Sequence, residues 1–150
     1  MNVSNIDHSL DMAANIKGAF AVALVDYDSG MTLGSRGGSP EFDLDVAAPG
    51  NSDVVRTKLE VMSKLGLREG IEDILITLDT QYHLIRPVNR GGDEKLFLYL
   101  VLNRAQANLA MARRDLRVIE QQFFMGVPVA PAARPTRVAR RSSRPTPASA

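Results

Sequence analysis

The residue types that most often perform catalysis are scarce in this chain and lie far apart. The 150 residues contain no cysteine and two histidines, His8 and His83. Without cysteine the chain can form no disulfide, thiolate nucleophile or cysteine-based zinc site. A serine nucleophile is commonly activated by a histidine base, and neither histidine is accompanied by a serine in a Gly-x-Ser-x-Gly turn. The sequence therefore predicts a protein that is not an enzyme, in which His83 is an ordinary strand residue.

Two glycine-containing segments resemble ligand-binding loops but lack residues that such loops require. The segment 34–39, Gly-Ser-Arg-Gly-Gly-Ser, could expose backbone N–H groups to a phosphate. It lacks the Gly-Lys-Ser/Thr ending and no helix follows directly, so a flexible loop is predicted. The segment 26–30, Asp-Tyr-Asp-Ser-Gly, has its glycine fifth where a calcium loop needs it sixth, and position twelve is Gly37. We predict a hairpin turn there, stabilised locally by Asp28, and no cofactor or metal ion held by this chain.

The charges divide the chain into an acidic body and a basic tail. Residues 1–125 hold 13 basic and 17 acidic side chains, a net charge of −4, whereas residues 126–150 hold five arginines and no acid. No basic stretch precedes an apolar run near the N-terminus, so no signal peptide is apparent. No apolar run is long enough to span a membrane. Together with the lack of cysteine, these features lead us to expect a cytoplasmic protein.

A run of seven apolar residues, 96–102, is the strongest structural signal in the chain. Side chains alternate between the faces of a strand, so four leucines of this run share one face, and Phe97, Tyr99 and Val101 share the other. Because both faces are apolar, both must be covered. The run therefore predicts a central strand in a sheet that has helices on each side.

The remaining apolar periodicities and turn signals predict a helix, two strands, a helix, three strands and a final helix. The final helix has the clearest pattern, with apolar residues three and four apart from Ala105 to Phe123. Ser4 is the expected N-cap of the first helix, because Asp7 follows three residues later. Pro49-Gly50 is expected to break the chain before the second helix. The predicted helices are 4–18, 51–65 and 105–123, and the predicted strands are 19–27, 31–34, 71–78, 82–88 and 96–102.

This order of elements, together with the segment GAFAVALVDYDSG at 18–30, resembles the Roadblock/dynein light chain family. The specific features are the Gly18-Ala19 step into the strand, the Asp26-x-Asp28-x-Gly30 turn, and a final strand that leads directly into the last helix. The resemblance implies an α/β protein of the α+β type, with a five-stranded antiparallel sheet, the middle helix on one face and the terminal helices on the other. We accordingly expect a Roadblock-like domain, 1–125, followed by a disordered tail rich in Arg, Pro and Ala, 126–150.

The resemblance also implies a homodimer, and the sequence itself offers apolar surface for one. The apolar residues of the second helix span an arc of about 160°, wider than covering a sheet requires, and Lys58 lies inside this arc. The lysine either extends its amine to solvent or meets an acid of a second subunit. The strand 71–78 is expected at a sheet edge, and its apolar face invites pairing with another chain. The predicted dimer contacts are Val54, Val55, Lys58, Leu59, Met62, Ile74, Ile76 and Leu78.

Bacterial members of this family bind small Ras-like GTPases and tune their nucleotide cycle. The resemblance therefore implies a non-catalytic regulator or scaffold for such a GTPase. Two other classes stay open: a small-molecule sensing domain of the profilin-like or PAS-like kind, and a structural adaptor without a GTPase partner. Four arginines of the last helix form either a solvated face or a docking face for an acidic partner; they are Arg104, Arg113, Arg114 and Arg117.

The tail has too few large apolar side chains to offset the entropy of folding, so we expect it to be disordered. Its arginines could make weak, salt-sensitive contacts with an anionic membrane or with nucleic acid. The segment 140–143, Arg-Arg-Ser-Ser, also resembles a basophilic kinase site. An unstructured linker is the default interpretation. The candidate contact residues are Arg137, Arg140, Arg141 and Arg144, and the candidate phosphosites are Ser142 and Ser143.

Overall fold

The computed structural model describes residues 3–89 and 95–126, and the chain divides into two compact units. The larger unit spans Asn5–Phe124. The smaller unit, Met1–Ser4 with Met125–Ala150, contains a short antiparallel ribbon in which β1 (Val3–Ser4) pairs with β7 (Met125–Gly126). The ribbon was not predicted from the sequence. Apart from Gly126, the predicted tail lies outside the described residues.

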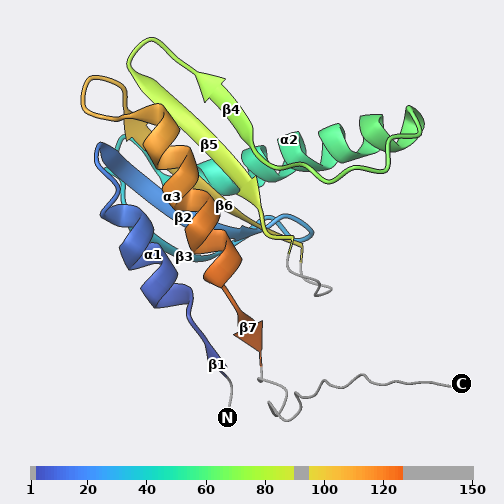
Figure 1. The fold of residues 1–150 in the computed structure, drawn as a ribbon, viewed down its shortest axis with the longest axis horizontal. Coiled ribbons are helices and arrows are strands. Elements are labelled where there is room, and N and C mark those ends of the chain that lie inside the picture. Colours follow the sequence, from blue (N-terminus) through green and yellow to red (C-terminus); the bar gives the residue numbers. More distant parts are fainter. Residues whose placement is uncertain (1–2, 90–94, 127–150) are drawn as a thin grey trace, which may run out of the picture. The chain divides into compact units, whose positions relative to one another are not determined.

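The larger unit is built on a sheet of five strands. They are β2 (Ala19–Asp26), β3 (Met31–Gly37), β4 (Ile74–Thr77), β5 (Gln81–Pro87) and β6 (Leu96–Asn103). All neighbours pair antiparallel, in the order β3-β2-β6-β5-β4 (Figure 1). Strand β6 is central, and its first seven residues are all buried. The prediction of a central strand with both faces covered is confirmed.

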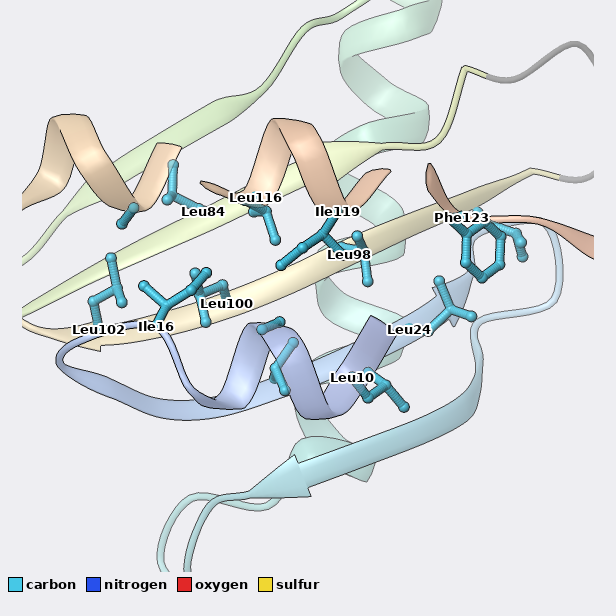
Figure 2. Packing of buried hydrophobic residues seen from close by; sticks show 14 residues of the cluster. Leu10, Ile16, Leu24, Leu84, Leu98, Leu100, Leu102, Leu116, Ile119 and Phe123 are labelled. Carbon is cyan, nitrogen blue, oxygen red and sulfur yellow. The ribbon is translucent and has the colours of Figure 1, made fainter. Parts of the chain in front are cut away.

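Helices cover both faces of the sheet (Figure 1). They are α1 (Ile6–Ala14), α2 (Leu44–Lys64) and α3 (Leu109–Gln122). On one face the leucines of β6 pack against Leu10 of α1 and against Leu116 and Ile119 of α3 (Figure 2). On the other face Phe97, Tyr99 and Val101 of β6 pack with Val55 of α2. The alternation within one strand thus supplies two cores, and the predicted α+β architecture is confirmed.

The first helix is capped differently from the prediction. Asn5 is the N-cap residue of α1, and its side chain makes no capping hydrogen bond. Instead, its Nδ2 donates to the carbonyl oxygen of Gln122 at 2.9 Å, and its Oδ1 accepts from the backbone N–H of Phe124 at 2.8 Å. The capping box expected from Ser4 and Asp7 is therefore wrong. The Asn5 side chain joins the start of α1 to the end of α3.

The second helix begins before the predicted break at Pro49-Gly50. Its N-cap is Asp43, whose carboxylate accepts a hydrogen bond from the Asp45 backbone N–H at 2.9 Å. Leu44 and Ala48 in the first turns are buried. Pro49 lacks an N–H and so removes one hydrogen bond from the helix. The capping and the burial offset that loss, so the predicted start of the helix after Pro49-Gly50 is wrong.

Strand β3 extends three residues beyond its predicted end and takes up part of the predicted glycine-rich loop. Gly37, its last residue, has φ +78°, and a Cβ atom there would collide with the carbonyl oxygen of Phe20. Glycine alone tolerates both conditions. On the neighbouring strand the register with β6 shifts between Ala19 and Ala21. The ring of Phe20, at this shift, lies edge-on to Phe42, with ring centroids 5.5 Å apart.

A turn at 104–108 separates β6 from α3, where direct passage was predicted. Two asparagines build it. Asn103 accepts a hydrogen bond from the Ala105 backbone N–H at 2.9 Å, and Asn108 caps α3 by accepting from the Met111 N–H at 3.1 Å. Ala105 thus precedes the helix, contrary to the prediction. The buried residues of α3 include Ala112, Leu116 and Ile119, which have the predicted spacing of four and three.

Candidate association surface

One side of α2 carries apolar side chains that the larger unit leaves exposed. Val54 and Val61 each expose 40% of their surface, and Leu65 exposes 68%. From Val54, the spacings to Lys58, Val61 and Leu65 are four, three and four, so these side chains lie within an arc of about 60°. We call these four residues the α2 stripe. The same spacing recurs where two helices pack along each other.

The buried side of α2 faces its own sheet and includes several of the predicted dimer contacts. Val55 is fully buried and packs with the core around Phe97. Met62 is 8% exposed, and Leu59 packs partly buried against the same core. The prediction that Val55 contacts a second subunit is therefore wrong, because its own subunit already encloses it. About half of the wide apolar arc is core, and the other half is the α2 stripe.

Strand β4 is an edge of the sheet, as predicted, and within the described residues it pairs only with β5. Ile74 and Ile76 lie opposite Ile85 and His83, so both face the α2 side of the sheet. Leu78 follows the end of the strand and is exposed. An unpaired strand edge can accept a strand from another chain. We call the α2 stripe and the β4 edge together the candidate association surface.

The segment that leads into β4 is fastened to α3 by ion pairs. Arg113 donates from Nε and Nη2 to the two carboxylate oxygens of Asp73, each at 2.9 Å. These hydrogen bonds raise the pKa of Arg113, and a two-point contact of this kind is the strong form of an arginine–carboxylate pair. Arg117 lies 3.5 Å from Glu72. Arg114 also pairs with an acid of its own subunit, since it lies 3.3 Å from Asp115. Three of the four arginines predicted to be solvated or to dock a partner thus bind acids of their own subunit.

His83 lies among aromatic side chains on the α2 side of the sheet. Its Nδ1 is 2.9 Å from the hydroxyl of Tyr99, and its Nε2 is 2.9 Å from Oε1 of Gln81. The ring meets Phe42 edge-on, with centroids 5.8 Å apart. Burial lowers the pKa of His83. Both ring nitrogens thus have partners within the same subunit.

A buried ion pair between β5 and α3 was missed by the sequence reasoning. The side chains of Arg86 and Glu120 expose 8% and 6% of their surface, and Nε and Nη2 of Arg86 both lie 3.2 Å from Oε1 of Glu120. A signal for the pair was present. Arg86 stands between Leu84 and Val88 on one apolar face of its strand, and Glu120 follows the buried Ile119 on α3.

The segment 26–30 forms a hairpin turn, as predicted, but Asp26 stabilises it rather than Asp28. The Oδ1 atom of Asp26 accepts hydrogen bonds from the backbone N–H groups of Asp28 and Ser29, at 2.8 and 3.2 Å. Over the ranges 3–89 and 95–126, no three His, Asp or Glu side chains are grouped so that they could hold a metal ion. In those same ranges no helix is long and apolar enough to cross a membrane.

The predicted sites in the tail lie outside the described residues. They are the contact residues Arg137, Arg140, Arg141 and Arg144 and the phosphosites Ser142 and Ser143.

The larger unit is an α+β domain whose antiparallel sheet lies between one long helix and two terminal helices, which is the Roadblock/LC7 fold. The Roadblock/LC7 domain from Streptomyces avermitilis matches it with a TM-score of 0.64 at 14% identity, over 77% of this chain and 91% of that one. MglB from Myxococcus xanthus matches with a TM-score of 0.68 at 17% identity, over 78% of this chain and 83% of that one.

A further solved structure, MglB in a tetrameric arrangement, matches with a TM-score of 0.58 at 15% identity, over 79% of this chain and 89% of that one. No family model matches the sequence, and no curated protein matches it. The fold is therefore shown by structure, and the fold expected from the family resemblance is confirmed.

Proposed function

We propose that this protein is a non-catalytic homodimer that acts in the cytoplasm, where it binds a small Ras-like GTPase and regulates its nucleotide cycle. The observation that carries the proposal is the Roadblock fold, which the chain shares with MglB over 78% of its length. The bacterial members of the family that the sequence resembles bind GTPases of this kind.

The candidate association surface supports the dimer. Val54, Val61 and Leu65 would expose apolar surface along one side of α2 to water on a single copy, and clustered exposed apolar side chains mark contact sites. Burial of apolar surface contributes roughly 25 cal/mol per Å², so packing this strip against its counterpart is favourable. A two-fold axis would place the same surface of both copies together. It would also bring the two β4 edges side by side, so that one sheet continues through both subunits.

Regulation would follow from differential binding. A dimer that binds one nucleotide state of the GTPase more tightly shifts the GTPase population toward that state. A tenfold difference in affinity corresponds to about 1.4 kcal/mol, which a few contacts to a switch segment can supply. The protein itself needs no nucleotide site for this role, because the GTPase carries the nucleotide.

Two measurements on the full chain test the proposal. Light scattering at micromolar concentration should give the mass of a dimer, and Ile76→Asp at the β4 edge and Lys58→Glu in the α2 stripe should each give the mass of a single subunit. Small GTPases encoded near the gene are then loaded with GDP or with a non-hydrolysable GTP analogue and immobilised. One of them should retain the protein in one nucleotide state with about tenfold preference.

Each part of the proposal has its own contrary outcome. A stable single subunit contradicts the dimer. Equal affinity for the two nucleotide states removes the regulatory role and leaves a scaffold. Retention by none of the GTPases favours the structural adaptor.

A further inference from the structure

A pocket of about 450 Å³ lies between the end of β5, the C-terminal half of α3 and the segment that precedes β4. It is separate from the candidate association surface. Six of its eight lining residues are polar or charged: Glu72, Arg86, Asn89, Arg117, Glu120 and Gln121.

The floor of the pocket is the buried pair Arg86–Glu120. Taking an arginine and a carboxylate out of water is expensive, and apolar side chains of similar size would stabilise such a position at least as well. The pairing also leaves hydrogen-bonding capacity unused on the Arg86 guanidinium and on the Glu120 carboxylate. Both donating nitrogens of Arg86, Nε and Nη2, converge on Oε1 of Glu120. The second oxygen, Oε2, has a long contact of 3.4 Å to the backbone N–H of Asn89.

The remaining guanidinium nitrogen, Nη1 of Arg86, makes no hydrogen bond within the described residues. Among those residues, Oγ1 of Thr32 is the one fully enclosed side-chain polar atom without a partner. Nη1 is not among such enclosed atoms, although the Arg86 side chain as a whole is more than nine-tenths buried. Because Arg86 lines the pocket and Nη1 has no partner within the ranges 3–89 and 95–126, this nitrogen can donate to a ligand at the pocket floor.

A second pair of opposite charges lies at the mouth of the pocket. Arg117 and Glu72 are 3.5 Å apart, and their side chains are 44% and 65% exposed. Pairs this exposed contribute little and exchange partners readily. The pocket thus presents two cations and two carboxylates. A simple anion or cation would meet a like charge beside each opposite one, whereas a ligand that carries both charges can satisfy both kinds of group.

We infer that this pocket binds a small zwitterion of the free amino acid class. The ligand carboxylate accepts hydrogen bonds from Nη1 of Arg86 and from Arg117, and the ligand ammonium donates to Oε2 of Glu120 and to Glu72. The volume lies at the lower end of the range for small-molecule sites, about 300–1,000 Å³, which suits a compound of this size. The inference does not depend on a GTPase partner.

Titration of the full chain with each common free amino acid, followed by calorimetry, tests the inference. At least one amino acid should bind saturably. Its methyl ester lacks the carboxylate, and its N-acetyl derivative lacks the ammonium. The affinity of each should be lower by a factor of about ten or more, since each loses one charged contact worth about 1.4 kcal/mol. A dipeptide separates the two charges and should also bind more weakly.

Substitutions at the exposed mouth leave the buried pair intact, so they test binding without threatening the fold. Arg117→Ala and Glu72→Ala should each weaken binding about tenfold. Arg114→Ala is the matched control, because Arg114 is another exposed arginine of α3, pairs with its neighbour Asp115, and does not line the pocket. Its affinity should equal that of the wild type.

Three outcomes would overturn the inference. They are the absence of saturable binding for every amino acid up to about 10 mM, an ester or dipeptide that binds as well as the free amino acid, and an unchanged affinity in Arg117→Ala.

Discussion

The imidazole of His83 and the phenol of Tyr99 are joined across strands β5 and β6 by a hydrogen bond of 2.9 Å. Burial raises the pKa of Tyr99, so its hydroxyl stays protonated at neutral pH and can donate to Nδ1 of His83. Nε2 then carries the ring proton and donates to Gln81. The network assigns His83 a neutral ring with a single tautomer.

This arrangement predicts a pH dependence of stability. The pKa of His83 is lowered by burial from the ordinary value of 6.5. The unfolded chain therefore binds a proton at this residue at a higher pH than the folded protein does. The free energy of unfolding should fall as the pH drops below about 6.5, and it should stop falling from this cause below the folded-state pKa.

The measurement is urea denaturation of the wild type and of His83→Gln at several pH values. Carboxylates titrate in both proteins, so the difference between the two curves isolates His83. A difference that stays constant between pH 7 and the acid limit of folding would mean that the ring is protonated as easily in the folded as in the unfolded chain.

Two glycines should respond to alanine in opposite directions. Gly37→Ala forces a Cβ atom into a left-handed residue against a backbone oxygen, and should lower the free energy of unfolding by about 2 kcal/mol or more. Gly50 lies inside α2 with nothing within 4 Å of an added Cβ. Gly50→Ala should therefore raise the free energy of unfolding by about 0.5–1 kcal/mol. Urea midpoints with unchanged slopes report both effects. Equal effects would remove the steric account of Gly37.

The elements that were predicted correctly are those whose signal is local. Strand β6 is recognisable because both of its faces are apolar, which is a property of seven consecutive residues. The signal for the start of α2 is not local. Pro49 taken alone indicates a break, but the helix continues through it because Leu44 and Ala48 pack against the sheet. The sequence does not contain that contact, so it placed the helix start too late.

The candidate association surface was half predicted for a similar reason. Val54 and Val55 are neighbours in sequence, and the apolar arc of the helix includes both. In the structure Val55 is core and Val54 is exposed, because residues 100° apart on a helix end on different sides. The sequence shows how wide such an apolar arc is. The orientation of the helix on its sheet decides which residues of the arc are buried and which stay exposed to solvent.

The buried pair Arg86–Glu120 should couple strongly in a double-mutant cycle. Arg86→Met leaves an unpaired buried carboxylate and should lower the free energy of unfolding by about 3–5 kcal/mol. Adding Glu120→Leu removes the orphaned charge and should restore most of that stability. Lys64→Met breaks the exposed pair with Glu60 and serves as the control, with an expected change below about 0.5 kcal/mol. Additive losses in the double variant would contradict the coupling.

Val61 and Val118 provide a matched pair for the dimer, because each is a helix valine with 40% of its surface exposed, one on α2 and the other on α3. An aspartate at either exposed position should change the stability of the folded subunit by no more than about 0.5 kcal/mol. Val61→Asp places a charge within the α2 stripe and should weaken self-association about tenfold or more, whereas Val118→Asp should leave it unchanged.

Sedimentation of both variants over a dilution series measures this difference. The reverse result, dissociation by Val118→Asp with an intact Val61→Asp dimer, would place the subunit contact on the face covered by α1 and α3. The β4 edges would then remain unpaired, and the continuous sheet proposed for the dimer could not form.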